Sequence, residues 1–149
     1  MDAVVFEEGE GEILSPGPIR VRFLAQSPDH PVAITESTVP PGFPGPTQHR
    51  HAQMTDIFYV LEGTLAFHLE GERRLLGPGS FVLVPPGVTH TFANPGPDPA
   101  RFLNIYQPAG NEQYVKEVAQ RMADGQSPSQ SEMAEIASRY DFAPVPETT

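Results

Sequence analysis

Three histidines and one aspartate stand in two short segments of this 149-residue sequence. The first segment carries His49 and His51 and reaches Asp56 a few residues later, and the second, from Gly79 to Asn94, carries His90. Imidazole nitrogens and a carboxylate oxygen together form a ligand set for borderline divalent ions such as Zn, Fe, Ni and Cu. Core packing gives no reason to gather such side chains, so the pattern indicates a metal site.

Strand geometry predicts how these side chains converge. Residues two apart on a β-strand point to the same face, so His49 and His51 project together, about 7 Å apart along the strand. His90 follows the turn Pro85-Pro86-Gly87, which would bring it alongside. The carboxylate of Asp56 then completes a mixed nitrogen and oxygen set, with room left for water, substrate or O₂.

The elements that must position these residues are short strands. The chain has 18 prolines and 13 glycines, and 38% of its residues are hydrophobic, which fits an all-β fold with many tight turns. Apolar runs recur between Gly/Pro turns, as in a β-sandwich or barrel. Residues 57–61 and 81–84 are apolar at every position, and we expect both runs to be buried on both faces.

The C-terminal forty residues change from strand to helix patterns. Two helices are predicted in this part of the chain, and a capping box formed by Ser129 and Glu132 marks the start of the second. We expect both helices to pack on the β-domain or on a partner subunit, and the chain from Asp141 on to be extended and partly frayed. The first helix is predicted over residues 112–123 from the apolar stripe Tyr114, Val118 and Met122.

Composition narrows the classes of partner and location. A net charge of −10 argues against nucleic acid and anionic membranes as partners, because both need a cationic face. The absence of cysteine excludes disulfides and thiolate ligands. The N-terminus does not read as a signal peptide and no apolar run reaches transmembrane length, so we expect a cytoplasmic protein.

The two segments resemble the two signature motifs of the cupin superfamily. The second motif, G-x5-P-x-G-x2-H-x3-N, spans residues 79–94 and is met at every position, by Gly79, Pro85, Gly87, His90 and Asn94.

The first motif, G-x5-H-x-H-x3,4-E-x6-G, is met with two departures over residues 42–63. His49, His51 and Gly63 match, whereas Gly42 lies one residue too far upstream and Asp56 stands where the family has glutamate.

The resemblance implies a fold, a cofactor and an assembly. The fold is a cupin double-stranded β-helix, a jelly-roll barrel over residues 1–110, followed by a helical extension of two short helices over residues 111–149. One divalent transition metal per chain (Fe, Ni, Cu, Mn, Co or Zn) is implied inside the barrel, and a homodimer is the implied assembly. The implied metal ligands are His49, His51, Asp56 and His90.

The sequence is most similar in pattern to quercetin 2,3-dioxygenase-like monocupins, which implies a metal-dependent dioxygenase acting with O₂ on a small aromatic or enolic substrate. Two alternatives remain open: a non-redox cyclase, isomerase or lyase that uses the ion to polarise a carbonyl, and a binding module without turnover. Asp56 also keeps two roles. It is either a ligand that doubles as catalytic base, or a group that orients a histidine or water without touching the ion. Phe58, Val60 and Phe92 share strand parity with Asp56 and His90 and are predicted to line the pocket.

Overall fold

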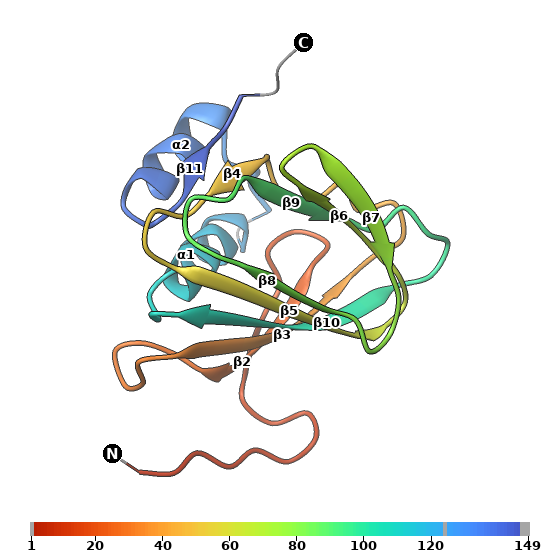
Figure 1. Ribbon diagram of the computed structural model, residues 1–149. Helices are drawn as coiled ribbons and strands as arrows, with labels where there is room; N and C mark the ends of the chain where they lie inside the picture. The colour runs from red at the N-terminus through yellow and green to blue at the C-terminus, as the bar shows by residue number, and fades with distance from the viewer. Residues whose placement is uncertain (1, 124, 147–149) are drawn as a thin grey trace.

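The computed structural model describes residues 2–123 and 125–146, which form two antiparallel sheets and two helices (Figure 1). The larger sheet has the order β1-β2-β3-β10-β5-β8, and the smaller has the order β11-β4-β9-β6-β7. The non-sequential order within each sheet is that of a jelly roll, which confirms the all-β prediction. The larger sheet comprises β1 (Glu12–Leu14), β2 (Arg20–Ala25), β3 (Ala33–Val39), β10 (Ala100–Gln107), β5 (Thr55–Glu62) and β8 (Phe81–Val84). The smaller sheet comprises β11 (Ala143–Pro144), β4 (His49–Arg50), β9 (His90–Ala93), β6 (Leu65–Leu69) and β7 (Glu72–Leu76).

The core lies between the facing sheets. Strands β3 and β10 alternate strictly between buried and partly buried residues, as expected for strands with one face toward the interior. The main core cluster draws on both sheets, and three of its aromatic rings and one that packs against it form tilted or edge-to-face pairs. These rings are Phe58, Phe67, Phe92 and Phe102.

The outer face of β5 and β8 differs from the prediction. Tyr59, Phe81 and Leu83 are 42%, 60% and 50% exposed, whereas Val82 and Val84 are buried. The expectation that residues 57–61 and 81–84 are covered on both faces is therefore wrong for the described part of the chain. These strands lie at one edge of the larger sheet, and only their inner face meets the other sheet.

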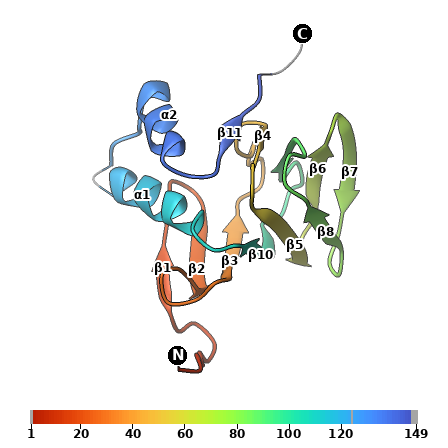
Figure 2. The same ribbon diagram turned by 60° about the vertical axis from the view of Figure 1, so that its left-hand side comes forward.

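The two helices follow the barrel as predicted. They are α1 (Glu112–Met122) and α2 (Gln130–Ser138), and Ser129 and Glu132 form the expected capping box at the start of α2. Figure 2 shows α1 beside β1 and β2, and α2 near β11 and β4. The carboxylate of Glu112 fastens α1 to the barrel, because it accepts hydrogen bonds from Ser27 N–H at 2.8 Å and Gly110 N–H at 2.7 Å. The division of the chain at residue 110 stays a prediction.

The chain beyond α2 is extended, but the expected fraying is wrong for residues 141–146. Ala143 and Pro144 form β11 and pair with Arg50 and His49 of β4. The rest of that expectation falls on residues outside the described part of the chain.

None of the helices in the described ranges has the length and apolar character needed to cross a membrane.

Candidate metal centre

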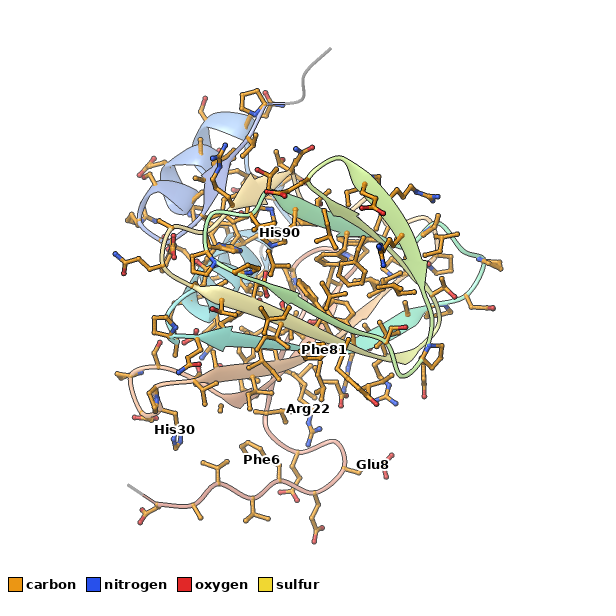
Figure 3. The ribbon with its side chains drawn as sticks, viewed as in Figure 1. Phe6, Glu8, Arg22, His30, Phe81 and His90 are labelled. Atoms are coloured by element: carbon orange, nitrogen blue, oxygen red, sulfur yellow. The ribbon has the colours of Figure 1, made fainter. Side chains whose placement is uncertain are left out.

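The four residues singled out by spacing meet between the two sheets. Asp56 comes from β5 of the larger sheet, while His49 of β4 and His90 of β9 are register partners in the smaller sheet. His51 follows directly after β4. One donor atom of each side chain lies within 4.8 Å of every other, and all four residues are buried. Figure 3 shows His90 at the end of the barrel near β4.

The turn of the second motif holds the two segments together. Gly87 donates its N–H to the carbonyl of His51 at 2.7 Å, and its φ of +87° lies in the region that favours glycine. The Pro-Pro-Gly turn therefore brings His90 beside the first motif, as its position in the sequence suggested.

Each histidine is oriented through its Nδ1 atom. Nδ1 of His49 lies 2.7 Å from the Thr47 carbonyl, and Nδ1 of His90 lies 3.0 Å from the Val88 carbonyl. Nδ1 of His51 lies 2.5 Å from the carbonyl of Asp141. A carbonyl can only accept, so each Nδ1 carries a proton, and Nε2 is the ring atom through which each neutral imidazole could hold an ion.

The Asp56 carboxylate reaches the imidazoles with one oxygen. Oδ2 lies 3.1 Å from Nε2 of His90 and 3.4 Å from Nε2 of His51. Two ligand atoms held about 2.0–2.2 Å from one ion lie roughly 3.0–3.5 Å apart at inter-ligand angles of about 90–110°. Asp56 Oδ2 therefore stands at the spacing of an adjacent ligand, and the shorter aspartate fits the position of the family's glutamate.

The buried carboxylate and imidazoles shift one another's pKa values. Burial raises the pKa of Asp56, but the nearby imidazoles of His51 and His90 outweigh this effect and hold that pKa below its usual value. Burial, with the neighbouring His90, lowers the pKa of His49 to about 4. Burial also lowers the pKa of His51, yet the Asp56 carboxylate and the Asp141 carbonyl more than compensate and leave it raised.

A mostly apolar cavity of about 320 Å³ opens from this cluster. Its wall includes Phe58 and Phe92, where strand parity placed them. The prediction that Val60 lines the pocket is wrong, because Val60 is fully buried in the core cluster and is not among the described residues of the cavity wall. Strand parity predicts which face of a strand a side chain lies on, but not how far along the barrel it lies. Val60 is two residues farther from Asp56 than Phe58 is, and there the two sheets pack directly against each other.

Two buried side-chain polar atoms in the described residues have no hydrogen-bond partner, and both belong to residues that line this cavity. They are Nε2 of His51 and Oδ1 of Asn111. Buried polar groups are almost always paired, so each of these atoms can bond to a ligand or a water molecule in the cavity. Nε2 of His51 belongs to the cluster of donor atoms that could hold a metal ion.

Several residues around the site were not found from the sequence. Asn104 and Tyr106 come from β10, and Asp141 and Phe142 come from the segment after α2. Strand alternation in residues 100–107 was a usable signal for the first two. The last two follow no motif, and only the folded chain brings them to the histidines.

A family model described as a cupin domain matches residues 35–106, which include both histidine segments and Asp56. The chain is also 32% identical over 90 residues to quercetin 2,3-dioxygenase from Bacillus subtilis (strain 168). This match covers 59% of the chain and 26% of that protein, so the chain spans about a quarter of this relative's length.

The fold comparison agrees. The structure of KdgF from Halomonas sp. matches with a TM-score of 0.66 at 23% identity, covering 75% of this chain and 99% of that one. The chain contains a cupin domain over residues 35–106. A second solved structure, that of the polyketide cyclase RemF from Streptomyces resistomycificus, matches with a TM-score of 0.54 at 27% identity, covering 66% of this chain and 69% of that one. The relatives of this cupin thus include a dioxygenase and a cyclase, and its buried cluster could bind a metal ion.

Proposed function

We propose that this cupin is a metal-dependent enzyme that acts on a small, mostly apolar organic molecule. The observation that carries the proposal is the convergence of three imidazoles and one carboxylate beside the apolar cavity, whose wall includes His49, His51 and Asp56. His49, His51 and His90 would hold the ion through Nε2, and Asp56 through Oδ2. A bound divalent ion would act as a Lewis acid on a substrate oxygen and lower the pKa of that oxygen.

The cavity wall and the backbone around the histidines would position the substrate and the metal ligands. The aromatic wall, which includes Phe43, Phe58 and Phe92, would hold a flat apolar body and keep water away from the reacting atoms. The backbone carbonyls at the three Nδ1 atoms keep the imidazoles in one tautomer and orientation.

Quercetinase-like dioxygenation of an aromatic or enolic substrate is the leading reaction, supported by the similarity to quercetin 2,3-dioxygenase. The test is to load the purified protein with Fe²⁺, Ni²⁺, Mn²⁺, Co²⁺, Cu²⁺ or Zn²⁺ and add quercetin in an oxygen-electrode cell. We expect O₂ uptake to match loss of the flavonol, ¹⁸O₂ label to enter the product, and His90→Ala to abolish both. Turnover that continues unchanged without O₂ would overturn this reaction.

A non-redox cyclase, isomerase or lyase is the second candidate, and the state of Asp56 favours it. Both carboxylate oxygens already have partners, because Oδ1 accepts from Asn104 Nδ2 at 2.6 Å while Oδ2 faces the histidines. Asp56 is the one carboxylate among the described residues that line the cavity, so a second carboxylate is not at hand as a base. Metal-dependent turnover of an enolic polyketide without uptake of O₂ would support this candidate. Binding of metal and ligand with no turnover of either substrate class would instead indicate a binding module.

We also propose that the chain works as a homodimer. The support is the exposed apolar patch formed by Tyr59, Phe81 and Leu83 on the outer face of β5 and β8. Adjacent exposed aromatic and aliphatic side chains on a flat sheet favour association with another protein surface. A second copy of the same chain is always present at matched concentration. The cytoplasmic location stays a prediction.

A further inference from the structure

The segment that follows α2 returns to the strand that carries His49. Ala143 and Pro144 pair with β4, and the N–H of Val145 donates to the Gln48 carbonyl at 2.8 Å. In Figure 1, β11 lies directly beside β4. The end of the chain is thus part of the sheet that builds the candidate metal centre.

Asp141 makes contacts of two kinds at the start of this segment. Its carboxylate accepts three backbone N–H groups, from Ala52 at 2.6 Å and from Gln53 and Met54 at 2.9 Å each. Its backbone carbonyl accepts from Nδ1 of His51. The three N–H groups belong to the turn that begins immediately after His51 and leads into the strand of Asp56.

These two contacts work together. The carboxylate fixes residue 141 on the turn, and the carbonyl of the same residue then lies at the imidazole of His51. The pKa of Asp141 lies below its usual value, because the three N–H donors outweigh the effect of burial, so the carboxylate is charged and a strong acceptor.

His51 is the exception among the three histidines. His49 and His90 find their Nδ1 acceptors two residues upstream on their own segments, at Thr47 and Val88. The acceptor of His51 lies ninety residues downstream in the chain. The orientation of one candidate ligand therefore depends on the docking of the C-terminal segment, whereas the other two are held locally.

The next residue strengthens the link. The ring of Phe142 stacks on His49 with a centroid distance of 4.3 Å and an interplanar angle of 18°. Its other stacking partner is Tyr114 of α1, at 5.2 Å and 18°. Residues 141 and 142 together thus touch two of the three imidazoles.

We propose that Asp141 is a positioning residue of the metal centre, through which the C-terminal segment sets the tautomer and ring orientation of His51 and hence the affinity for the ion. The inference rests on the proposed metal site. Without the Asp141 carboxylate, the turn after His51 and the C-terminal segment are no longer joined by these three hydrogen bonds. The His51 ring then loses its fixed acceptor, and the proton can move to Nε2, where it blocks the ligand position.

The test measures metal binding by the full-length protein, with Zn²⁺ as the probe in competition with a chromophoric chelator. The variants are Asp141→Ala, Asp141→Asn and the control Asp29→Asn, which alters an exposed loop aspartate. We expect Asp141→Ala to weaken Zn²⁺ binding about 10- to 100-fold, the range found for partners of metal-ligating histidines. Asp141→Asn keeps one acceptor oxygen and should fall between Asp141→Ala and the wild type, while Asp29→Asn should equal the wild type.

A second readout separates positioning from a general loss of stability. In the metal-free protein, ¹⁵N chemical shifts of the imidazoles report the tautomer. We expect His51 to hold its proton on Nδ1 in the wild type and to become a mixture of tautomers in Asp141→Ala, with His90 unchanged. Asn94→Ala, which removes hydrogen bonds to the carbonyls of Pro40 and Asp98 and none to a histidine, should lower the melting temperature and leave the His51 tautomer unchanged.

The outcomes distinguish this inference from the proposed function. If wild type and His90→Ala bind Zn²⁺ equally weakly, the metal site itself is wrong and the inference falls with it. If the wild type binds and His90→Ala does not, but folded Asp141→Ala keeps wild-type affinity and the Nδ1 tautomer, only the role of Asp141 is overturned.

Discussion

Asn104 donates from Nδ2 to Oδ1 of Asp56 at 2.6 Å, and it makes a second hydrogen bond to the Ile57 carbonyl at 2.9 Å. Both side chains are buried, and they come from the neighbouring strands β10 and β5. The amide holds one oxygen of the carboxylate, so the other oxygen stays turned toward the imidazoles. A carboxylate ligand in a metal site commonly has such a partner.

Substitution of Asn104 by leucine is expected to weaken metal binding. The change leaves Oδ1 of Asp56 buried without a donor, and the carboxylate is then free to rotate away from the imidazoles. We expect Zn²⁺ affinity to fall about 10- to 100-fold, measured by chelator competition on the folded protein.

Asn94→Leu is the matched control for this substitution. The Asn94 amide donates to the carbonyls of Pro40 at 3.1 Å and Asp98 at 2.8 Å, which organise a turn rather than the histidine cluster. Its loss should cost about 1–3 kcal/mol of unfolding free energy while the folded fraction keeps wild-type affinity. Equal affinity in the Asn104 variant and the wild type would contradict the assigned role of Asn104.

Asn111→Leu is expected to stabilise the protein in the absence of ligand. Oδ1 of Asn111 is buried without a partner, and although Asn111 is the N-cap of α1, its side chain makes no capping hydrogen bond. A leucine of similar size removes an unpaired polar group, which should raise the unfolding free energy by about 1 kcal/mol. Thermal or urea unfolding of metal-free protein measures the gain.

The control at this position is Gln113→Leu. The Gln113 amide has a partner, since Nε2 donates to the Ser27 carbonyl at 3.1 Å, so its replacement should not stabilise the protein. A loss of stability in Asn111→Leu similar to that in Gln113→Leu would indicate that Oδ1 of Asn111 is satisfied by water. It would then not be an open acceptor for a ligand.

The sequence predicted the parts of the site that are local. His49, His51 and Asp56 lie within one strand–turn–strand passage, and Gly87 and His90 lie within one turn, so their spacing carries the geometry. Strand alternation and the helix signals likewise depend on neighbours along the chain. They predicted a β-sandwich or barrel followed by two helices, whereas the jelly roll was implied by the resemblance to cupins.

The parts that could not be predicted depend on distance across the fold. Asp141 acts on His51 from the far end of the chain, and nothing in the intervening sequence sets that contact. Val60 is buried in the core and Phe81 is exposed because the other sheet covers only the inner face of their strands. An apolar run shows that a face can be buried, but it does not identify what buries it.

Acid is expected to destabilise the contact between α1 and the barrel through Glu112. Burial raises the pKa of this carboxyl, but the hydrogen bonds from Ser27 and Gly110 outweigh it, so the pKa in the folded protein is lowered. A lowered folded-state pKa means that the stabilisation is fully present above the unfolded-state pKa. It is lost as pH falls through the folded-state pKa, here below about 4.5.

Glu112→Gln measures this contribution. We expect the variant to lose about 1–3 kcal/mol of unfolding free energy at pH 7, because hydrogen bonds to a charged acceptor become bonds to a neutral one. The difference from wild type should shrink as pH falls below about 4.5, where the wild-type carboxyl also becomes neutral. Urea unfolding from pH 7 to pH 3 gives both values. Glu8→Gln, at an exposed residue labelled in Figure 3, should leave the curve unchanged, and a constant difference at all pH values would contradict the assignment.

Charge placed on the outer face of β5 and β8 is expected to dissociate the proposed homodimer. Phe81 and Leu83 are 60% and 50% exposed on this face, and burying two carboxylates without partners in an interface is costly. Phe81→Glu combined with Leu83→Glu should therefore convert a dimer to a monomer in sedimentation equilibrium, with the circular dichroism spectrum unchanged. Leu75→Glu is the control, because Leu75 is 58% exposed but lies on β7 of the other sheet. A wild-type protein that sediments as a monomer would contradict the homodimer, and dissociation by Leu75→Glu alone would place the interface on the smaller sheet instead.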